Sequence, residues 1–197
     1  REHDTISSAG DIRGALHGRR GRLPGALLGF PGMYLGVVLN PMARKNRNVP
    51  PEADARIERL VGPWGEVVRT DSLAALRPAV ERMLPRVTHF VSDGGDGALH
   101  WLINEVRRAS GGDTSAASWP VFIPTNGGTI DFVAHKAGVR GRTEAIVRAL
   151  VGAASSGEPV PDVRLDSLHL EGEHHDGAPF DRVGFALAAC GVGLRFF

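Results

Sequence analysis

The sequence predicts an α/β protein in which a parallel sheet lies between two layers of helices, followed by the start of a mainly antiparallel β domain. Segments typical of strands and of helices alternate between residues 34 and 151, as in repeated βαβ units. Near residue 160 the pattern changes to apolar residues at every second position, which is typical of strands with one exposed face. We expect a loosely packed or disordered extension at 1–32, an α/β domain at 33–158 and the beginning of a β-rich domain at 159–197.

The composition excludes several classes of protein. A chain of 197 residues with 42% hydrophobic residues has enough apolar material for one domain and part of a second. The net charge of +1 gives no electrostatic footprint for nucleic acid. The single cysteine, Cys190, rules out an internal disulfide framework, so we expect a cytoplasmic protein. No apolar run approaches the roughly 20 residues of a membrane span, so we expect no transmembrane segment and any lipid contact to be peripheral.

The extension at 1–32 is rich in glycine, serine and arginine and has few periodic apolar residues. Its cations are either solvated, the commoner case, or in contact with anionic lipid headgroups; they are Arg13, Arg19, Arg20 and Arg22. The oligomeric state stays open, with a homodimer as one alternative.

The first strand is expected at 34–39, an uninterrupted apolar run. It ends at Asn40 and Pro41, where the missing proline N–H stops the hydrogen-bond ladder and a polar loop begins. In open α/β sheets, ligands bind at this carboxyl end of the strands. Periodicity then predicts a helix at 52–61, a strand at 65–70 and a helix at 73–83.

The central feature is a glycine-rich turn between a strand at 87–91 and a helix at 99–108. The turn contains Gly94, Gly95, Asp96 and Gly97. Glycine permits positive φ and leaves no Cβ between the backbone and a ligand. The first N–H groups of the following helix are unpaired and partly positive. The sequence therefore predicts a phosphate site at this turn.

A second glycine-rich turn follows the next strand. A polar loop at 110–118 leads to a strand at 120–124, and residues 125–132 then form a glycine-rich exit into a helix. Another helix is expected at 144–151. The β-rich part is expected to open with a hairpin, with strands at 163–170 and 182–189 and a turn at 171–179.

Three motifs in this order resemble the catalytic domain of the diacylglycerol kinase family of lipid kinases, which includes sphingosine kinases and is related in fold to NAD kinases. They are Asn40-Pro41, Gly94-Gly95-Asp96-Gly97 and Gly127-Gly128-Thr129-Ile130-Asp131-Phe132. The resemblance covers roughly residues 34–197. It implies that 33–158 is a nucleotide-binding domain and that 159–197 is the beginning of an incomplete lipid-binding domain. It implies transfer of the γ-phosphoryl group of ATP, with Mg²⁺, to the hydroxyl of diacylglycerol or a related lipid at a membrane surface. The residues that it places at the nucleotide are Asn40, Pro41, Met42, Ala43, Arg44, Thr70, Gly94, Gly95, Asp96, Gly97, Ala98, Leu99, His100, Gly128, Thr129 and Asp131.

The acidic residues near these motifs each have two interpretations. Asp96 either binds Mg²⁺, directly or through water, or holds its loop by accepting backbone N–H bonds. Asp131 either caps the following helix or acts at the substrate. For Glu105 we favour solvent or a helix ion pair over the site. No catalytic base is assigned, because the family supplies it from a part of the second domain that would lie beyond Phe197.

The histidines are interpreted as structural or exposed, because none forms a pair at metal-ligand spacing on a clear helix. They are His89, His100, His135, His169, His174 and His175.

The chain departs from the family pattern at three positions. Ala98 and His100 stand where the family has a threonine and an asparagine, and Ile130 stands where it has an asparagine. Two alternatives to a lipid kinase therefore stay open: an NAD kinase-like enzyme, and a nucleotide-binding protein without transfer activity. The loop after Asn40 favours the lipid kinase over the NAD kinase.

Overall fold

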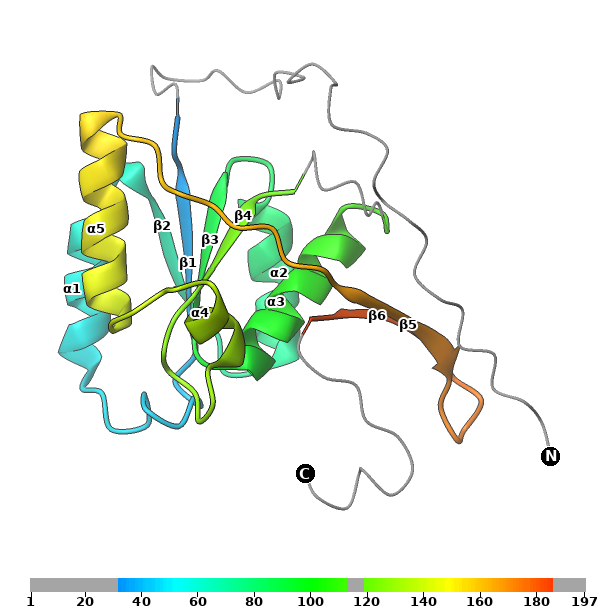
Figure 1. Cartoon of the computed structure of the whole chain (residues 1–197). Coiled ribbons are helices and arrows are strands. Elements are labelled where there is room, and N and C mark those ends of the chain that lie inside the picture. The colour runs from blue at the N-terminus through cyan, green and yellow to red at the C-terminus, as the bar shows by residue number, and fades with distance from the viewer. Residues whose placement is uncertain (1–31, 113–118, 186–197) are drawn as a thin grey trace, which may run out of the picture.

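A computed structural model describes residues 32–112 and 119–185 (Figure 1). The expected extension, apart from Gly32, lies outside the described residues, as do most of the polar loop at 110–118 and the end of the last predicted strand. The expected division into domains is not tested by these residues and stays a prediction.

The centre of the structure is a four-stranded sheet. Its strands are β1 (Leu35–Leu39), β2 (Gly65–Arg69), β3 (His89–Asp93) and β4 (Val121–Pro124). They lie in the order β2-β1-β3-β4, and every neighbouring pair is parallel. The predicted parallel sheet is confirmed.

Helices cover both faces of the sheet, which gives the predicted three layers. Helices α1 (Pro51–Val61) and α5 (Thr143–Ser156) pack on one face, and α2 (Leu73–Met83) and α3 (Asp96–Ala109) on the other. A short 3-10 turn, η1 (Gly62–Trp64), precedes β2, and the short helix α4 (Phe132–Lys136) lies near the carboxyl ends of the strands.

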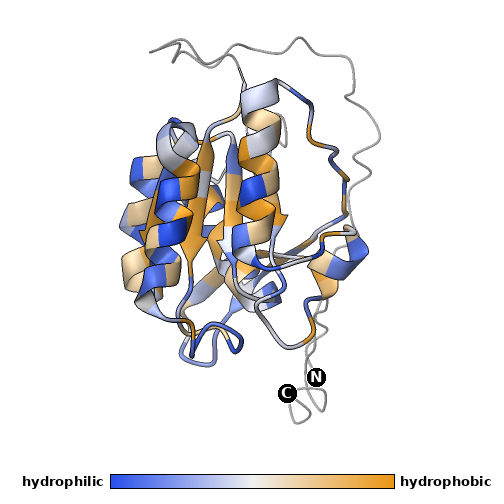
Figure 2. Cartoon of the chain, turned by 90° about the vertical axis from the view of Figure 1, so that its left-hand side faces the viewer, coloured by the Kyte–Doolittle hydropathy of each residue, from blue (hydrophilic) through white to orange (hydrophobic). Residues whose placement is uncertain are grey.

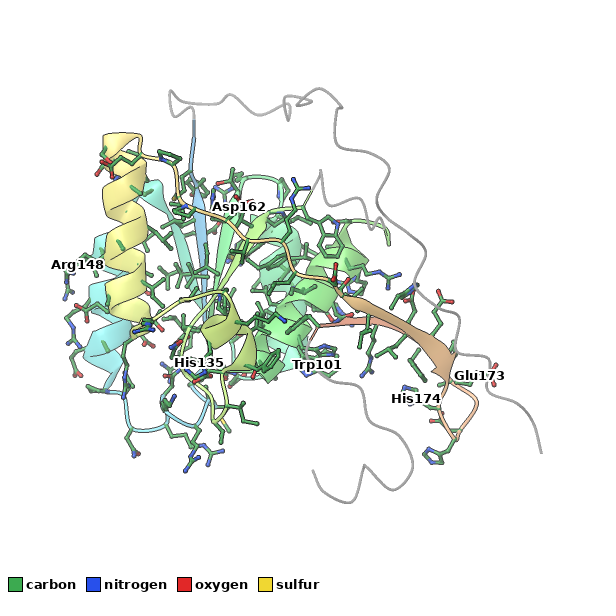
Figure 3. All side chains as sticks on the ribbon, in the orientation of Figure 1. Trp101, His135, Arg148, Asp162, Glu173 and His174 are labelled. Carbon is green, nitrogen blue, oxygen red and sulfur yellow. The ribbon has the colours of Figure 1, made fainter. Side chains whose placement is uncertain are left out.

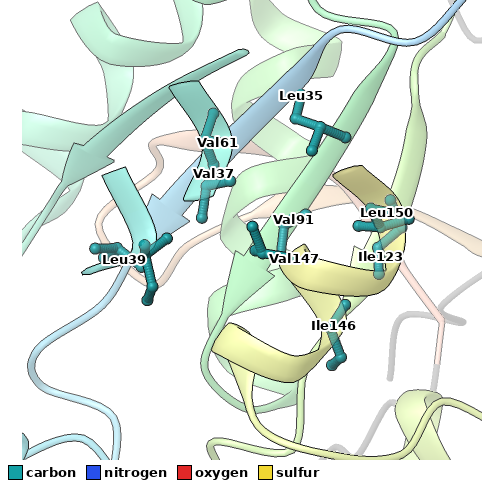
Figure 4. Packing of buried hydrophobic residues seen from close by; sticks show 10 residues of the cluster. Leu35, Val37, Leu39, Val61, Val91, Ile123, Ile146, Val147 and Leu150 are labelled. Atoms are coloured by element: carbon teal, nitrogen blue, oxygen red, sulfur yellow. The ribbon is translucent and has the colours of Figure 1, made fainter. Parts of the chain in front are cut away.

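The core consists of two apolar clusters, one on each face. On one side Val37 of β1 packs with Val61 of α1 and Val147 of α5 (Figure 4). On the other side Val38 packs with the residues of α2 and α3. Successive residues of a buried strand point to opposite faces, so an uninterrupted apolar run is what this strand needs. The strands are largely orange in the hydropathy view, whereas the helices mix polar and apolar positions (Figure 2).

The connections diverge at the carboxyl ends of β1 and β3. The chain leaves β1 through α1 toward one edge of the sheet, and it leaves β3 through α3 toward the other edge on the opposite face. Such a switch point opens a crevice between adjacent strands, where ligands bind in open α/β sheets. The loops that follow β1, β3 and β4 all meet at this edge, at the bottom of Figure 1.

Two boundaries near the first glycine-rich turn differ from the sequence prediction. Strand β3 runs to Asp93, and α3 begins at Asp96, three residues before the expected start. Glycine has low helix propensity and contributes no apolar side chain, so the sequence pattern underestimates the length of this helix at its N-terminus. The turn itself is therefore only Gly94 and Gly95, and Asp96 and Gly97 form the first turn of the helix.

The second, smaller sheet is an antiparallel hairpin of β5 (Leu168–Glu173) and β6 (Pro179–Gly184). The predicted hairpin exists, but its strands and turn are displaced from the expected positions. A tight turn at 174–178 sets the pairing: the His174 N–H donates to the Ala178 carbonyl, and Gly177 has a φ of 78°. Glycine is suited to that left-handed conformation.

The hairpin docks on α3. The Asn104 side chain donates to the Val183 carbonyl at 2.8 Å and accepts from the Val183 N–H at 2.9 Å, as a neighbouring strand would. Arg107 forms two hydrogen bonds with the Asp181 carboxylate, at 2.6 and 2.8 Å.

In the part of the chain that the structure describes, no helix is long and apolar enough to cross a membrane.

Candidate functional site

The two glycine-rich turns pack backbone against backbone. A Cβ added to Gly95 would lie 2.7 Å from the Cα of Gly128, and one added to Gly127 would lie 2.8 Å from the Cα of Gly94. These glycines therefore allow the two turns to touch each other, and the expectation that their bare backbone also meets a ligand stays a prediction. Gly97 differs, because an added Cβ would meet nothing within 4 Å.

A cavity of about 310 Å³ lies beside the contact between the turns. Nine of the ten residues that line it belong to the predicted nucleotide site, and the tenth is Ile130. The lining consists of Asn40, Ala43, Arg44, Gly95, Asp96, Gly97, Ala98, Gly128, Thr129 and Ile130. The three motifs, separated by up to about 90 residues in the sequence, thus share one cavity.

The N-terminus of α3 opens into this cavity. Gly95 occupies the N-cap position and offers no side-chain cap, and its carbonyl accepts the Ala98 and Leu99 N–H groups. The N–H groups at the start of an uncapped helix carry partial positive charge and favour an anion. The exposed cation Arg44 lies in the same wall. The residues present therefore fit a phosphate group.

Asp96 stands in this helix terminus but directs its carboxylate to α4. Its two oxygens accept the N–H groups of Phe132 and Val133, each at 2.9 Å. This geometry matches the interpretation that Asp96 holds the loop. A carboxylate accepts about four hydrogen bonds, so each oxygen keeps a lone pair. Magnesium binding by Asp96 stays a prediction.

Asp131 is a buried residue that stabilises the second glycine-rich turn through its carboxylate. It has a left-handed φ of 55°, is 2% exposed, and makes no side-chain cap to α4. Its carboxylate accepts the Gly128 N–H at 2.8 Å and the ammonium group of Lys45 at 2.8 Å. The expected capping role therefore belongs to Asp96, and the buried Asp131 carboxylate fixes the turn.

Lys45 is a site residue that the sequence analysis missed. Its ammonium group also donates to the Asn126 carbonyl at 2.9 Å, and its N–H donates to the Gly127 carbonyl at 3.1 Å. The side chain thereby ties the loop after β1 to the turn after β4. In the sequence, Lys45 is only a cation in the loop after the first strand, and Asp131 is only an acid in the second glycine-rich turn. The contact between them is tertiary, so no local pattern reveals it.

Asp93, the last residue of β3, is a second missed residue. Burial raises the pKa of Asp93 above its ordinary value, although hydrogen bonds from Thr143, Asn46 and Thr125 oppose the rise. The Asn46 amide donates at 2.9 Å and the Thr125 hydroxyl at 3.4 Å. Asp93 therefore links β3 to the loop after β1, the second turn and the start of α5. It lines a second cavity, of about 360 Å³, between the first turns of α1 and α5.

Comparison with solved structures finds eleven similar chains, of which two are described here. No family model matches the chain, and no curated protein does. Two crystal structures of Bacillus anthracis proteins named as diacylglycerol kinases match with TM-scores of 0.42 and 0.41 and 15% identity. Each match covers 60% of this chain and 42% of the other, so the chain spans less than half the length of these proteins. The chain is similar to both.

Several predicted site residues lie outside the cavity of the glycine-rich turns. Thr70 is buried, and its N–H donates to the Leu39 carbonyl at 2.9 Å. Leu99 points into the core at 2% exposed. Pro41 lines the other cavity, and the Met42 side chain is 58% exposed. Spacing along a helix or loop places a residue near the site, but its face decides whether it lines the cavity.

His100 is directed to the hairpin. Its ring lies 5.2 Å from the Trp101 ring and 6.1 Å from the Phe185 ring, centroid to centroid. Burial, with a smaller contribution from the Arg182 charge, lowers the pKa of His100. A neutral imidazole in this position does not provide a positive charge for phosphate.

The remaining predicted roles concern residues away from the cavity. Glu105 is buried and pairs with Arg77 and Arg108, so the ion-pair interpretation is confirmed. Burial raises the pKa of Glu105, but these two arginines more than offset the rise and leave the pKa below its ordinary value. His135 is exposed on α4, and His174 lies at the tip of the hairpin (Figure 3).

One cluster on the hairpin has the composition of a metal site. His169, Glu171 and Asp181 bring ligand atoms within 4.8 Å of one another. The Arg107 guanidinium, however, binds both oxygens of the Asp181 carboxylate and already supplies the positive charge. We interpret the cluster as the ion-pair network that fixes the hairpin to α3.

Proposed function

We propose that the chain is the nucleotide-binding part of an ATP-dependent lipid kinase, which transfers the γ-phosphoryl group of ATP to the hydroxyl of diacylglycerol or a related lipid. One observation carries the proposal: the uncapped N-terminus of α3 opens into a cavity that all three kinase-like motifs line. The order of the motifs supports a lipid kinase, and the cavity supports the binding of its nucleotide.

In this proposal the phosphates of ATP lie against the backbone of Gly95, Asp96 and Gly97, with Arg44 as the side-chain cation. Phosphoryl transfer depends mainly on positioning and on neutralising charge, so backbone N–H groups and a helix terminus perform much of the work. Because the Asp96 carboxylate accepts two N–H groups of α4, it adds less repulsion toward phosphate than a free carboxylate in the helix terminus. When bound, Mg²⁺ supplies further charge neutralisation, and Asp96 is the residue that would hold it, directly or through water.

A second candidate is a nucleotide-binding protein without transfer activity. Two observations favour it. The cavity wall has the methyl group of Ala98 where the family has a hydroxyl. Among the described residues of that wall, the only carboxylate is Asp96, and it is engaged by α4. Transfer of labelled phosphate from ATP to diacylglycerol distinguishes the two candidates when it is assayed with the rest of the second domain, which the resemblance places beyond Phe197. Under those conditions the second candidate still predicts binding of ATP without labelled lipid.

Binding of ATP is tested at Gly97, where the cavity wall has room for a side chain. Gly97→Val places a branched side chain at the cavity wall, where its Cβ meets no atom within 4 Å apart from its chain neighbours and its own helix backbone, so we expect the fold to tolerate it. We expect ATP affinity, measured by calorimetry with Mg²⁺, to fall at least about tenfold, which is about 1.4 kcal/mol.

The matched control is Gly152→Val on α5. An added Cβ there also meets nothing within 4 Å, and the residue lines neither cavity. We expect this variant to bind ATP like the parent. Equal ATP affinity of the Gly97 variant and the parent would place the nucleotide elsewhere and overturn the proposal.

A further inference from the structure

The two loops beside the nucleotide cavity are strongly basic. Residues 40–50 contain three cations, Arg44, Lys45 and Arg47, and no acid. Residues 126–143 contain Lys136, Arg140 and Arg142, and their single acid, Asp131, is buried against Lys45. The whole chain has a net charge of only +1, so this is a local concentration of positive charge.

The fold brings these two loops to the same edge. The Lys45 N–H donates to the Gly127 carbonyl at 3.1 Å, and the Arg142 guanidinium donates to the Lys45 carbonyl at 3.4 Å. Both loops lie at the bottom of Figure 1, on either side of the carboxyl ends of the strands. The tertiary structure therefore gathers six cations from two separate segments at one edge of the sheet.

Large apolar side chains project from the same two loops. Met42 is 58% exposed, Ile130 is 66% exposed and Phe132 is 44% exposed. Ile130 lines the cavity that Ala43 and Arg44 also line, so one of the three apolar side chains lies at the cavity itself. The Lys136 ammonium lies 5.9 Å from the centroid of the Phe132 ring. Exposed apolar residues among cations are the composition of a surface that enters a membrane interface.

We propose that this basic edge, residues 40–50 and 126–143, docks on a bilayer that contains anionic phospholipid. The cations match the negative surface of such a bilayer, and Met42, Ile130 and Phe132 enter its interface. A nucleic acid fits less well, because methionine and isoleucine offer no aromatic ring for stacked bases. The inference deepens the proposed function, since docking by this edge brings the mouth of the nucleotide cavity to the lipid.

The experiment is sedimentation of the full chain with vesicles of phosphatidylcholine, with and without phosphatidylserine. We expect binding only with phosphatidylserine, and loss of binding at high salt, where the screening length falls to about 3 Å. The edge variant combines Arg47→Gln, Lys136→Gln and Arg140→Gln, three exposed residues that do not line the nucleotide cavity. Each cation near an anionic surface contributes about fivefold, so this variant should bind roughly a hundredfold more weakly.

The charge-matched control combines Arg59→Gln, Arg82→Gln and Arg148→Gln. These cations are exposed on α1, α2 and α5, and Arg148 lies on the outer side of α5 (Figure 3). We expect vesicle binding like that of the parent. An equal loss in both triple variants would show that net charge alone drives binding and would overturn the proposal.

Two further variants test the apolar residues and the other candidate cations. Met42→Ser with Phe132→Ser should weaken vesicle binding at constant charge. No effect of this pair would contradict insertion and favour a polyanion such as nucleic acid as the partner. Replacing the four arginines of the N-terminal extension, Arg13, Arg19, Arg20 and Arg22, with glutamine should leave most of the binding, and loss of all binding there would overturn the assignment to the basic edge.

Calorimetry with ATP separates this inference from the proposed function. The edge variant should bind ATP like the parent. A parent that binds phosphatidylserine vesicles but no ATP would refute the nucleotide site and leave the docking surface standing. A parent that binds ATP but no vesicles would refute the docking surface alone.

Discussion

The two glycine-rich turns look alike in sequence and do different work in the structure. The first leads directly into the 14-residue helix α3, whose N-terminus has no side-chain cap. The second leads, through the left-handed Asp131, into the five-residue helix α4, whose first N–H groups are bound by Asp96 of the first turn. The first glycine-rich turn therefore leads to unpaired N–H groups that favour an anion, and the second turn packs against the first.

The glycines of these turns serve two different purposes, close packing of backbone and space in the cavity. Gly95 and Gly128 touch each other, so each is required by the other's backbone. Gly97 touches nothing, so its lack of a side chain leaves room in the cavity. A glycine-rich motif thus combines packing and ligand positions that its spacing does not separate.

The largest expected effect is on the contact between the turns. In Gly128→Ala the new Cβ would lie 2.5 Å from the Cα of Gly95 and 2.7 Å from the Asp131 carboxylate, so backbone must move. We expect a loss of about 3 kcal/mol in the free energy of unfolding, measured with urea. Gly97→Ala is the control, with a gain of roughly 0.5–1 kcal/mol because alanine replaces glycine in a helix. Equal stability of the two variants would mean that the turns do not pack as described.

A smaller effect is expected where one turn caps the other. Asp96→Ala removes both acceptors of the α4 N-terminus and should cost about 1 kcal/mol, whereas Asp96→Asn keeps one acceptor and should cost less. The pair also tests the magnesium role. If Asp96 holds the metal, Asp96→Asn lowers ATP affinity with Mg²⁺, whereas without Mg²⁺ the loss of its negative charge beside the phosphates leaves the affinity unchanged or raises it. Equal changes under both conditions would restrict Asp96 to its cap.

How far the sequence predicts this site depends on whether an interaction is local. The parallel sheet, its layers and nine residues of the cavity follow from periodicity, glycine turns and the resemblance. The bond between Lys45 and Asp131 joins residues 86 positions apart, and the bonds of Asp93 reach the loop after β1, the second turn and α5. No local pattern marks such pairs, because either partner alone is an ordinary charged residue near a turn.

The hairpin shows a second limit of sequence patterns. Alternation at 163–167 predicts a strand, but the observed β5 begins at Leu168, where a partner strand is available. Pairing and the turn at Gly177 set the register, and exposed alternating residues without a partner stay unpaired. Likewise, the resemblance that placed His100 near phosphate left the direction of its side chain open, and contact with the hairpin determines that direction.

Asp93 offers a pH-dependent test of the link between the turns. Its pKa is raised by burial, so the ionised form is disfavoured in the fold, and the parent loses stability as the pH rises through this raised pKa. Asp93→Asn keeps the shape of the side chain and removes the charge. We expect the stability of the variant relative to the parent to increase between about pH 4 and about pH 7, by urea unfolding. The same pH dependence of the free energy of unfolding in both proteins would show that ionisation of Asp93 does not destabilise the fold.

A gain in ATP affinity is expected at Ala98, in the first turn of α3, where the family has a threonine. Ala98 lines the cavity, so Ala98→Thr places a hydroxyl beside the proposed phosphates. One added hydrogen bond contributes roughly 0.5–1.5 kcal/mol, or up to about 3 kcal/mol with a charged oxygen, so ATP should bind severalfold to about a hundredfold more tightly.

The alternative, in which His100 binds phosphate as a cation, predicts that parental affinity falls as the pH rises through the pKa of His100. Because that pKa is lowered and the ring faces the hairpin, we expect parental ATP affinity to be flat between about pH 6 and about pH 8. Flat affinity combined with no gain from Ala98→Thr would mean that the phosphates lie farther from this turn than the geometry of α3 indicates.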